Sequence, residues 1–270
     1  MSDVLAQIIK TKHAEVAAAK KATPIGKLEV RVKSTPPVRS FEAAIRAPGI
    51  RVIAECKSKS PSKGIMLHNY NPVALGRSYE AGGCAAISVL TDRQYFGGSL
   101  ADLVAVRSSV GVPCLRKDFI IDPYQIFETR AHGADSFLLL AGVLDAKTIE
   151  EYLTLGRRLG LEPLVESHNE EELEIALATS ARILGINNRD LKSFTVDLNH
   201  SKRLLAMAQR PGGAATAAEP RIVVCESGIK NRSDVEMMTG VGYKVFLIGE
   251  SLATSPHPQS ALQDLIAGSR

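Results

Sequence analysis

The sequence contains no long uncharged apolar segment. No run approaches the ~20 residues that are needed to span a bilayer. Acidic and basic residues interrupt the apolar positions of the first 21 residues, so this stretch does not read as a signal peptide. We therefore expect a cytoplasmic protein with no membrane partner.

Cysteine is also scarce. The four cysteines are Cys56, Cys84, Cys114 and Cys225, and they form no C-x-x-C pair and have no histidine at ligand spacing. This pattern excludes a disulfide framework and predicts no metal site. Each cysteine lies in or beside a short apolar run, which favours small buried side chains in a reducing compartment.

The excess of charge of one sign is small. The 33 Lys and Arg against 29 Asp and Glu leave a net charge of +4, spread along 270 residues. Such a distribution predicts no nucleic-acid partner, although a local excess would suit a small anionic ligand. A chain of this length with 45% hydrophobic residues can bury a large core without help from metals or disulfides.

Eight short apolar runs rich in β-branched residues recur along the chain. They are continuous rather than alternating in polarity, which is typical of strands buried on both faces. The predicted strands are residues 51–56, 84–90, 112–115, 136–140, 162–165, 183–186, 222–225 and 244–248.

Helical patterns separate these runs. Pro123 and a pair of glycines, Gly82 and Gly83, mark helix boundaries. Strands that alternate with helices predict a parallel sheet, and eight units in this length favour a closed (β/α)8 TIM barrel. No G-x-G-x-x-G follows the first strand, which weighs against a doubly wound fold. The predicted helices are residues 72–81, 122–130, 145–159, 169–179, 199–209 and 233–239.

About fifty residues precede the first strand. Residues 2–21 form an amphipathic pattern with Leu5, Ile8 and Val16 near one face, and residues 23–50 read as a connection with a short helix near 41–46. We expect one barrel domain over 1–270, with 1–50 as an N-terminal helical extension that packs on the barrel mouth. The stretch 211–220 predicts a surface loop at the opposite end.

Polar residues end several of the apolar runs. Glu55 and Lys57 are two positions apart and should point the same way, while Cys56 points outward. Because the carboxyl ends of barrel strands converge on one site, we expect these residues to meet. The others that end predicted strands are Lys117, Glu166, Asn187, Glu226 and Ser227.

A second group suggests phosphate binding. Gly228 and Gly249 follow the seventh and eighth strands, where barrels commonly bind phosphate through backbone amides. Ser60 and Lys63 follow the first strand and add a hydroxyl and a positive charge. We interpret the histidines as peripheral, with His168 in a surface loop. The residues thus predict a barrel enzyme that acts on a small phosphorylated substrate through Lys and Glu.

The same stretches, in order, resemble the indole-3-glycerol phosphate synthase family. The resemblance covers nearly the whole chain and rests on residues 54–64 (AECKSKSPSKG), 88–99, 115–119 (LRKDF), 164–166, 186–191, 226–229 and 247–252. It implies that the chain converts 1-(2-carboxyphenylamino)-1-deoxyribulose 5-phosphate to indole-3-glycerol phosphate, carbon dioxide and water. It also implies that the enzyme needs no cofactor and has this small molecule as its partner, and we expect a monomer.

The resemblance further implies a role for each matched residue. Lys117 matches the general acid, Glu166 the carboxylate of the later proton transfers, and Lys57 the lysine at the substrate carboxylate. The family lysine that Lys57 matches has also been assigned a proton-donating role, so the resemblance leaves open which lysine acts at which step. Residues that match polar contacts to the substrate or to each other are Glu55, Asn187, Glu226 and Ser227. The matched phosphate positions are Ser60, Gly228, Gly249 and Glu250. Candidates for the apolar wall around the anthranilate ring are Phe119, Leu138, Leu191 and Ile248.

Two alternatives remain at this point. A phosphoribosylanthranilate isomerase would share the phosphate loops, but it uses a Cys–Asp pair and would leave Lys117 and Glu166 unexplained. A catalytically silent barrel used as a binding module should have lost one of the charged residues, and none is lost.

Overall fold

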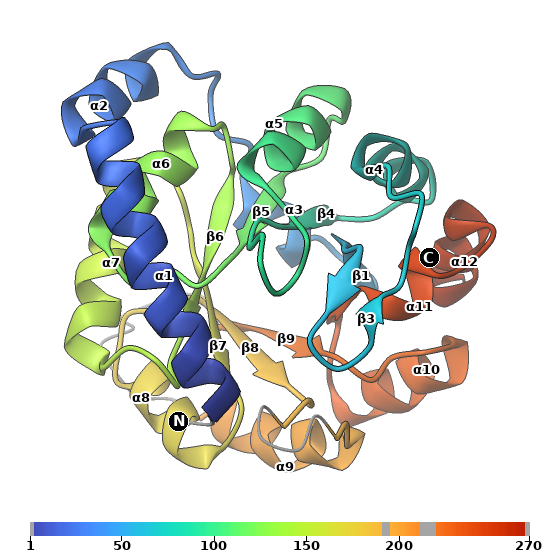
Figure 1. Cartoon of the computed structure of the whole chain (residues 1–270). Coiled ribbons are helices and arrows are strands. Elements are labelled where there is room, and N and C mark those ends of the chain that lie inside the picture. The colour runs from blue at the N-terminus through green and yellow to red at the C-terminus, as the bar shows by residue number, and fades with distance from the viewer. Residues whose placement is uncertain (1–2, 191–194, 211–219, 268–270) are drawn as a thin grey trace.

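Eight parallel strands close into a barrel in the computed structural model, which describes residues 3–190, 195–210 and 220–267 (Figure 1). Around the barrel the order is β1, β10, β9, β8, β7, β6, β5, β4, and every neighbouring pair is parallel. The predicted (β/α)8 fold is confirmed. The barrel strands are β1 (Arg51–Cys56), β4 (Ala86–Leu90), β5 (Cys114–Lys117), β6 (Ser136–Leu140), β7 (Leu164–Ser167), β8 (Ile183–Asn187), β9 (Ile222–Glu226) and β10 (Val245–Ile248).

The strands are buried on both faces, as their continuous apolar pattern predicts. Ile53 belongs to the core inside the barrel, whereas its neighbours Val52 and Ala54 belong to the core between barrel and helices. The same alternation sends Cys56 outward and leaves Glu55 and Lys57 on the inner side. The barrel interior is therefore a packed apolar core along most of its length, with charge gathered at one end.

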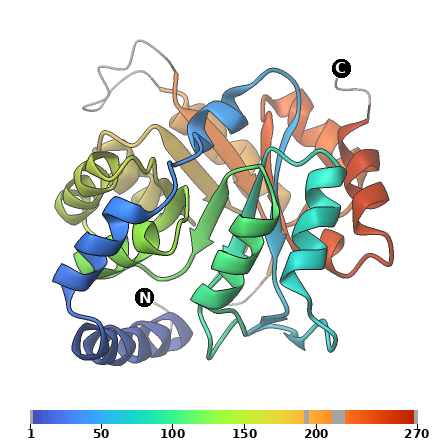
Figure 2. The same ribbon diagram turned by 90° about the horizontal axis from the view of Figure 1, so that it is seen from above.

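Helices cover the outside of the barrel (Figures 1 and 2). The pattern predicts α4 at its observed bounds and α6 to α10 to within about two residues, but α5, α11 and α12 were not predicted. A two-stranded hairpin, β2 (Lys59–Ser60) with β3 (Gly64–Ile65), follows β1. The helices around the barrel are α4 (Pro72–Ala81), α5 (Leu100–Ser109), α6 (Pro123–Ala131), α7 (Ala146–Arg158), α8 (Glu170–Leu177), α9 (Leu198–Ala208), α10 (Arg232–Val241), α11 (Glu250–Ala253) and α12 (Pro258–Ile266).

Side-chain caps fix where several of these helices begin. Asn71, Asp145 and Asn169 each accept a hydrogen bond from a backbone N–H in the first turn of the following helix. Asp145 and Asn169 come shortly after β6 and β7, so these two caps also fix the short loops that follow those strands.

The N-terminal segment reaches both ends of the barrel (Figure 2). Helix α1 (Asp3–Ala22) contacts the loops that follow β4 and β5, and α3 (Phe41–Arg46) inserts Phe41 and Ile45 into the inner core at the end where the strands begin. Between them, α2 (Ile25–Ser34) buries Leu28 against Tyr124 of α6. The sequence did not predict α2, because charged residues alternate with its few apolar ones.

Within the part of the chain that the structure describes, no helix is long and apolar enough to cross a membrane. The loop predicted at 211–220 falls on residues 211–219, which lie outside the described residues.

Candidate active site

A cavity of about 400 Å³ lies at the carboxyl ends of the barrel strands. The wall combines charged and apolar side chains from all eight barrel strands, together with the loops that follow these strands. Of the predicted residues that the structure describes, all but Ser60 line this cavity. They are Glu55, Lys57, Lys117, Phe119, Leu138, Glu166, Asn187, Glu226, Ser227, Gly228, Ile248, Gly249 and Glu250.

Lys117 and Glu166 form a buried ion pair across the cavity floor. Lys117 Nζ lies 2.9 Å from Glu166 Oε2, and Asn187 Nδ2 donates to Glu166 Oε1 at 2.9 Å. Burial alone would lower the pKa of Lys117, but the carboxylates around it, Glu166 first, raise that pKa well above its ordinary value. Burial alone would raise the pKa of Glu166, yet Lys117 and the hydrogen-bond donors hold it well below its usual range. Both groups are therefore charged at neutral pH.

Glu226, at the end of β9, is the opposite case. Its Oε2 lies 3.6 Å from Lys117 Nζ, and its side chain is almost fully buried. Burial and then the charge of Glu166 raise the pKa of Glu226 well above the ordinary value. Gly185 on β8 makes room for it, because a Cβ there would overlap Glu226 Oε1. The cavity floor thus holds one ionised and one protonated carboxyl group, which is how sites separate base from acid.

Glu55 and Lys57 form the second ion pair of the site. Lys57 Nζ donates to Glu55 Oε1 at 2.6 Å. Gly249 lies against this pair, and a Cβ there would come within 2.5 Å of Glu55 Oε1. The glycine after β10 therefore has a steric reason to be a glycine, in addition to any contact with a ligand.

The chain turns sharply after β9. Ser227 has a φ of 64°, and it is the only non-glycine residue with positive φ in the described ranges. Gly228 follows with a φ of 91°, and a Cβ there would lie 2.8 Å from Val196 Cγ1. A serine held in the left-handed region costs conformational energy, and such strain tends to occur at functional sites.

The rim of the cavity carries positive charge around Glu250. Lys63 Nζ lies 2.5 Å from Glu250 Oε1, and Arg189 Nη2 lies 3.8 Å from Glu250 Oε2. Ser60 lines a smaller cavity beside the main one, together with Lys57, Arg189 and Glu250. Lys59, on the same hairpin, bonds instead to the backbone oxygen of Gln94.

Apolar side chains cover the other side of the cavity. Phe119 packs against Phe96 with ring centroids 6.1 Å apart, and Leu138 belongs to the inner core. Ile248 lines the cavity but packs in the outer core, whereas its neighbour Leu247 belongs to the inner one. Leu191 lies outside the described residues. Cavity residues that were not among the predicted site residues include Leu90, Phe96, Leu140, Arg189, Val196, Lys230 and Leu247.

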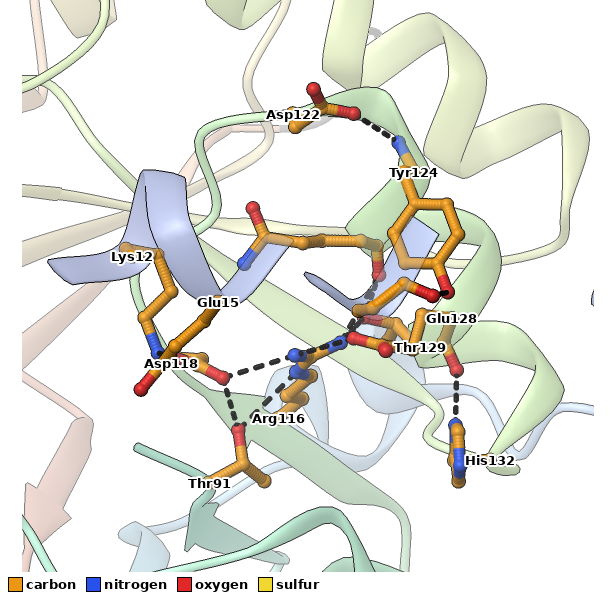
Figure 3. Close-up of polar contacts among 12 residues, drawn as sticks. Lys12, Glu15, Thr91, Arg116, Asp118, Asp122, Tyr124, Glu128, Thr129 and His132 are labelled. Atoms are coloured by element: carbon orange, nitrogen blue, oxygen red, sulfur yellow. Dashed lines mark hydrogen bonds and ion pairs between the residues drawn. The ribbon is translucent and has the colours of Figure 1, made fainter. Parts of the chain in front are cut away.

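A cluster of charges joins α1 to the strand that carries Lys117 (Figure 3). Lys12 Nζ lies 2.9 Å from Asp118 Oδ1 and 3.0 Å from Asp92 Oδ2, and Arg116 Nη2 lies 3.0 Å from Asp118 Oδ2. Burial would raise the pKa of Asp118, but Arg116 and Lys12 lower it to about 2. This cluster fixes Asp118 and hence the end of β5.

Neither Cys56 nor His168 lines the cavity. Cys56 is fully buried in the outer core, so the Cys–Asp chemistry of an isomerase has no thiol here in the cavity. The peripheral interpretation of His168 is wrong, since its side chain is 7% exposed and reaches Glu166. In the described ranges, no three His, Cys, Asp or Glu side chains are grouped as metal ligands.

Two solved structures of low sequence identity share the fold. One is a 3-hexulose-6-phosphate synthase, with a TM-score of 0.59 and 15% identity, covering 81% of this chain and 99% of its own. The other is thiamine phosphate pyrophosphorylase from Pyrococcus furiosus, with a TM-score of 0.57 and 13% identity, covering 80% and 93%. They support the barrel architecture alone.

Sequence relatives are much closer. The protein-family model described as indole-3-glycerol phosphate synthase matches residues 5–265. A relative of that name from Roseiflexus sp. strain RS-1 is 42% identical over the full length of both chains. Another from Mycolicibacterium smegmatis is 43% identical over 97% of this chain and 93% of its own. This chain belongs to the indole-3-glycerol phosphate synthase family.

Proposed function

We propose that this protein closes the indole ring of 1-(2-carboxyphenylamino)-1-deoxyribulose 5-phosphate, with release of carbon dioxide and water. The observation that carries the proposal is the buried Lys117–Glu166 ion pair, 2.9 Å between Nζ and Oε2, at the floor of a cavity with one charged and one apolar side. The substrate has the matching parts, namely an aromatic ring, a carboxylate, a ketone and a phosphate.

Lys117 supplies the proton for the first step. Transfer of a proton from its ammonium to the C2 carbonyl oxygen makes C2 electrophilic. The ring carbon that bears the carboxylate then forms a bond to C2, and loss of carbon dioxide returns the electron pair to the ring. The pKa of Lys117, which is raised by Glu166 and the other carboxylates, keeps the group protonated before this transfer.

Glu166 and Glu226 serve the dehydration that follows. The C2 hydroxyl leaves as water after it is protonated, and C1, now a carbon of the five-membered ring, loses a proton, which completes the aromatic indole. Glu166 is ionised and can accept a proton, whereas Glu226 is protonated and can donate one. Asn187 orients Glu166 through its 2.9 Å hydrogen bond, and Ser227 adds a polar contact at the same end of β9.

Charges at the two ends of the cavity hold the substrate. Lys57, paired with Glu55, takes the substrate carboxylate. The substrate phosphate binds at the cavity rim near Lys63. Backbone groups of Gly228, Gly249 and Glu250 and the hydroxyl of Ser60 contact it there. The Glu250 carboxylate would repel a phosphate, so its backbone N–H makes the contact.

The anthranilate ring takes the apolar side. Phe119 and Leu138 flank it, and Leu247 offers an inward side chain next to Ile248. Burial of an aromatic ring on such a wall excludes water from the reacting carbon. The assignment of Leu191 to this wall stays a prediction.

We extend the proposal to the whole chain. Residues 1–270 form one barrel domain, and 1–50 act as an extension whose helix α1 packs on the mouth, supported by the contacts of Lys12. The protein works in the cytoplasm as a monomer whose partner is the small-molecule substrate, with no nucleic acid or membrane partner and no cofactor. Gel filtration with light scattering measures the molar mass in solution and so tests whether the protein is a monomer.

The activity is tested by incubating the purified chain with the carboxyphenylamino-deoxyribulose phosphate and recording the indole spectrum. We expect indole-3-glycerol phosphate to accumulate, with carbon dioxide in equal amount. A parallel reaction with phosphoribosylanthranilate tests the isomerase alternative. Turnover of phosphoribosylanthranilate without indole formation from the first substrate would overturn the proposal.

A further inference from the structure

His168 joins two carboxylates behind the cavity wall. It follows β7 two residues after Glu166, and its Nε2 lies 3.0 Å from Glu166 Oε1. On the other side of the ring, Nδ1 lies 3.0 Å from Glu172 Oε2, on α8. Neither His168 nor Glu172 lines the cavity, so the two side chains can act on the reaction only through Glu166.

Glu172 is held in place from several directions. Its Oε2 accepts from the backbone N–H of His168 at 2.8 Å, and its Oε1 accepts from Asn169 Nδ2 at 3.0 Å. Gly142, just after β6, leaves space for the carboxylate, because a Cβ there would lie 2.7 Å from Glu172 Oε1. Glu172, the residue of this row of three side chains that lies farthest from the cavity, is thus held in place. Fixed outer contacts of this kind keep a reacting group, here Glu166, in its productive orientation.

The surroundings of His168 favour its charged form. Burial would lower the pKa of His168, but Glu166 and Glu172 raise it to about 10. His200, on α9, also faces this region, and burial together with Arg203 lowers its pKa, so it stays neutral at pH 7. The imidazolium of His168 therefore sits between two carboxylates with no second histidine cation beside it.

We infer, on the basis of the proposed function, that His168 is a positioning residue that transmits the fixed orientation of Glu172 to Glu166 and keeps Glu166 ionised beside protonated Glu226. Two neighbouring carboxyl groups repel, and the one with more donors retains the charge. Glu166 has donors or cations in Lys117, Asn187 and His168, whereas Glu226 has Lys117 at 3.6 Å. His168 thereby helps to decide which of the two is base and which is acid.

The charge on His168 can be measured without any substrate. In ¹⁵N-histidine-labelled protein, we expect the His168 ring to be protonated at both nitrogens from pH 6 to about 9, whereas an ordinary histidine titrates near ~6.5. Glu172→Gln removes one carboxylate and should lower the His168 midpoint by about one unit or more. A wild-type midpoint near 6.5, or no change in Glu172→Gln, would overturn the inference.

Kinetics test the effect on Glu166. For His168→Gln and Glu172→Gln we expect kcat to fall at least ~10-fold through misplacement of Glu166, with KM within about twofold because neither residue lines the cavity. In His168→Gln the acid limb of the kcat/KM profile should move about one unit toward higher pH. In Glu172→Gln it should not move in that direction, because His168 keeps its charge at acid pH. Glu171→Gln, on the exposed side of the same helical turn, is the matched control and should match the wild type in every measurement.

Some results would contradict this account. If His168→Gln keeps the wild-type pH profile and only lowers the melting temperature, the residue is merely structural. If the wild type forms no indole product, the proposed function fails, while the NMR titration still decides whether Glu172 fixes the charge of His168.

Discussion

Lys12 Nζ lies 2.9 Å from Oδ1 of Asp118, which links the N-terminal helix to the residue next to Lys117 (Figure 3). Lys12 reaches from α1 to the loops that follow β4 and β5, and its side chain is 4% exposed. A buried ion pair across two segments a hundred residues apart couples the placement of α1 to that of the strand end.

Replacement of Lys12 by methionine should destabilise the fold. Asp92 and Asp118 would lose a buried partner, and the loss of one partner of a buried pair costs on the order of 3 kcal/mol. Urea unfolding measures the loss in the free energy of unfolding. The kcat of the variant should also fall, because the end of β5 moves. Lys10→Met, an exposed position on the same helix, is the control and should change neither quantity. Equal stability of the two variants would show that Lys12 does not anchor α1.

The lowered pKa of Asp118 predicts how the stability of the fold changes at acid pH. Its pKa is about 2 in the folded protein and ~3.9 in an unfolded chain. A lowered folded pKa gives stability that is present above pH 4 and lost as the pH falls through 4 toward 2. In urea unfolding over this range, Asp118→Asn should show a shallower loss than the wild type. An identical pH slope would contradict the assignment.

Gly185 predicts a steric effect on Glu226. Alanine at this position would overlap Glu226 Oε1 and displace the carboxyl group, so we expect kcat to fall about 100-fold. Gly240→Ala is the matched control, because a Cβ at Gly240 on α10 meets nothing within 4 Å. It should leave kcat unchanged. Wild-type turnover in Gly185→Ala would show that Glu226 is not needed where it lies.

Lys63 predicts the strength of phosphate binding. Its Nζ lies on the cavity rim, and loss of one charged hydrogen bond costs about 1.5 kcal/mol or more, equivalent to roughly tenfold in affinity. We expect the inhibition constant of inorganic phosphate to rise about tenfold in Lys63→Gln. Lys59→Gln, on the same hairpin but bonded to Gln94, should stay within twofold. An equal effect of both would indicate only a general charge effect.

The strands could be predicted from apolar runs, but two of the predicted ranges end too early in the sequence. The predictions 112–115 and 162–165 end before Arg116, Lys117, Glu166 and Ser167, which β5 and β7 include. Those strands carry charge inside the barrel, where ion pairs and hydrogen bonds compensate it. A pattern of apolar residues therefore ends before the charged residues of the site, although these residues still belong to the strand.

The site residues could largely be predicted because the carboxyl ends of barrel strands converge. Successive side chains of a strand point to opposite faces, so the order Glu55, Cys56, Lys57 correctly predicts two inward side chains and an outward thiol. The contacts of His168 could not be predicted, because its second partner, Glu172, comes from α8 and the space for Glu172 depends on Gly142 after another strand. The sequence does contain one indication: His168 lies two residues after Glu166, and residues two apart along a strand point to the same side.

The most direct test of the account is the rate of indole-3-glycerol phosphate formation by Lys117→Met beside the wild type, with substrate binding measured in both. We predict a kcat at least ~100-fold lower in the variant, with an affinity for the substrate that changes much less, since Lys57 and the phosphate contacts remain. A variant whose kcat stays close to that of the wild type would contradict the central claim that Lys117 is the acid of the ring closure.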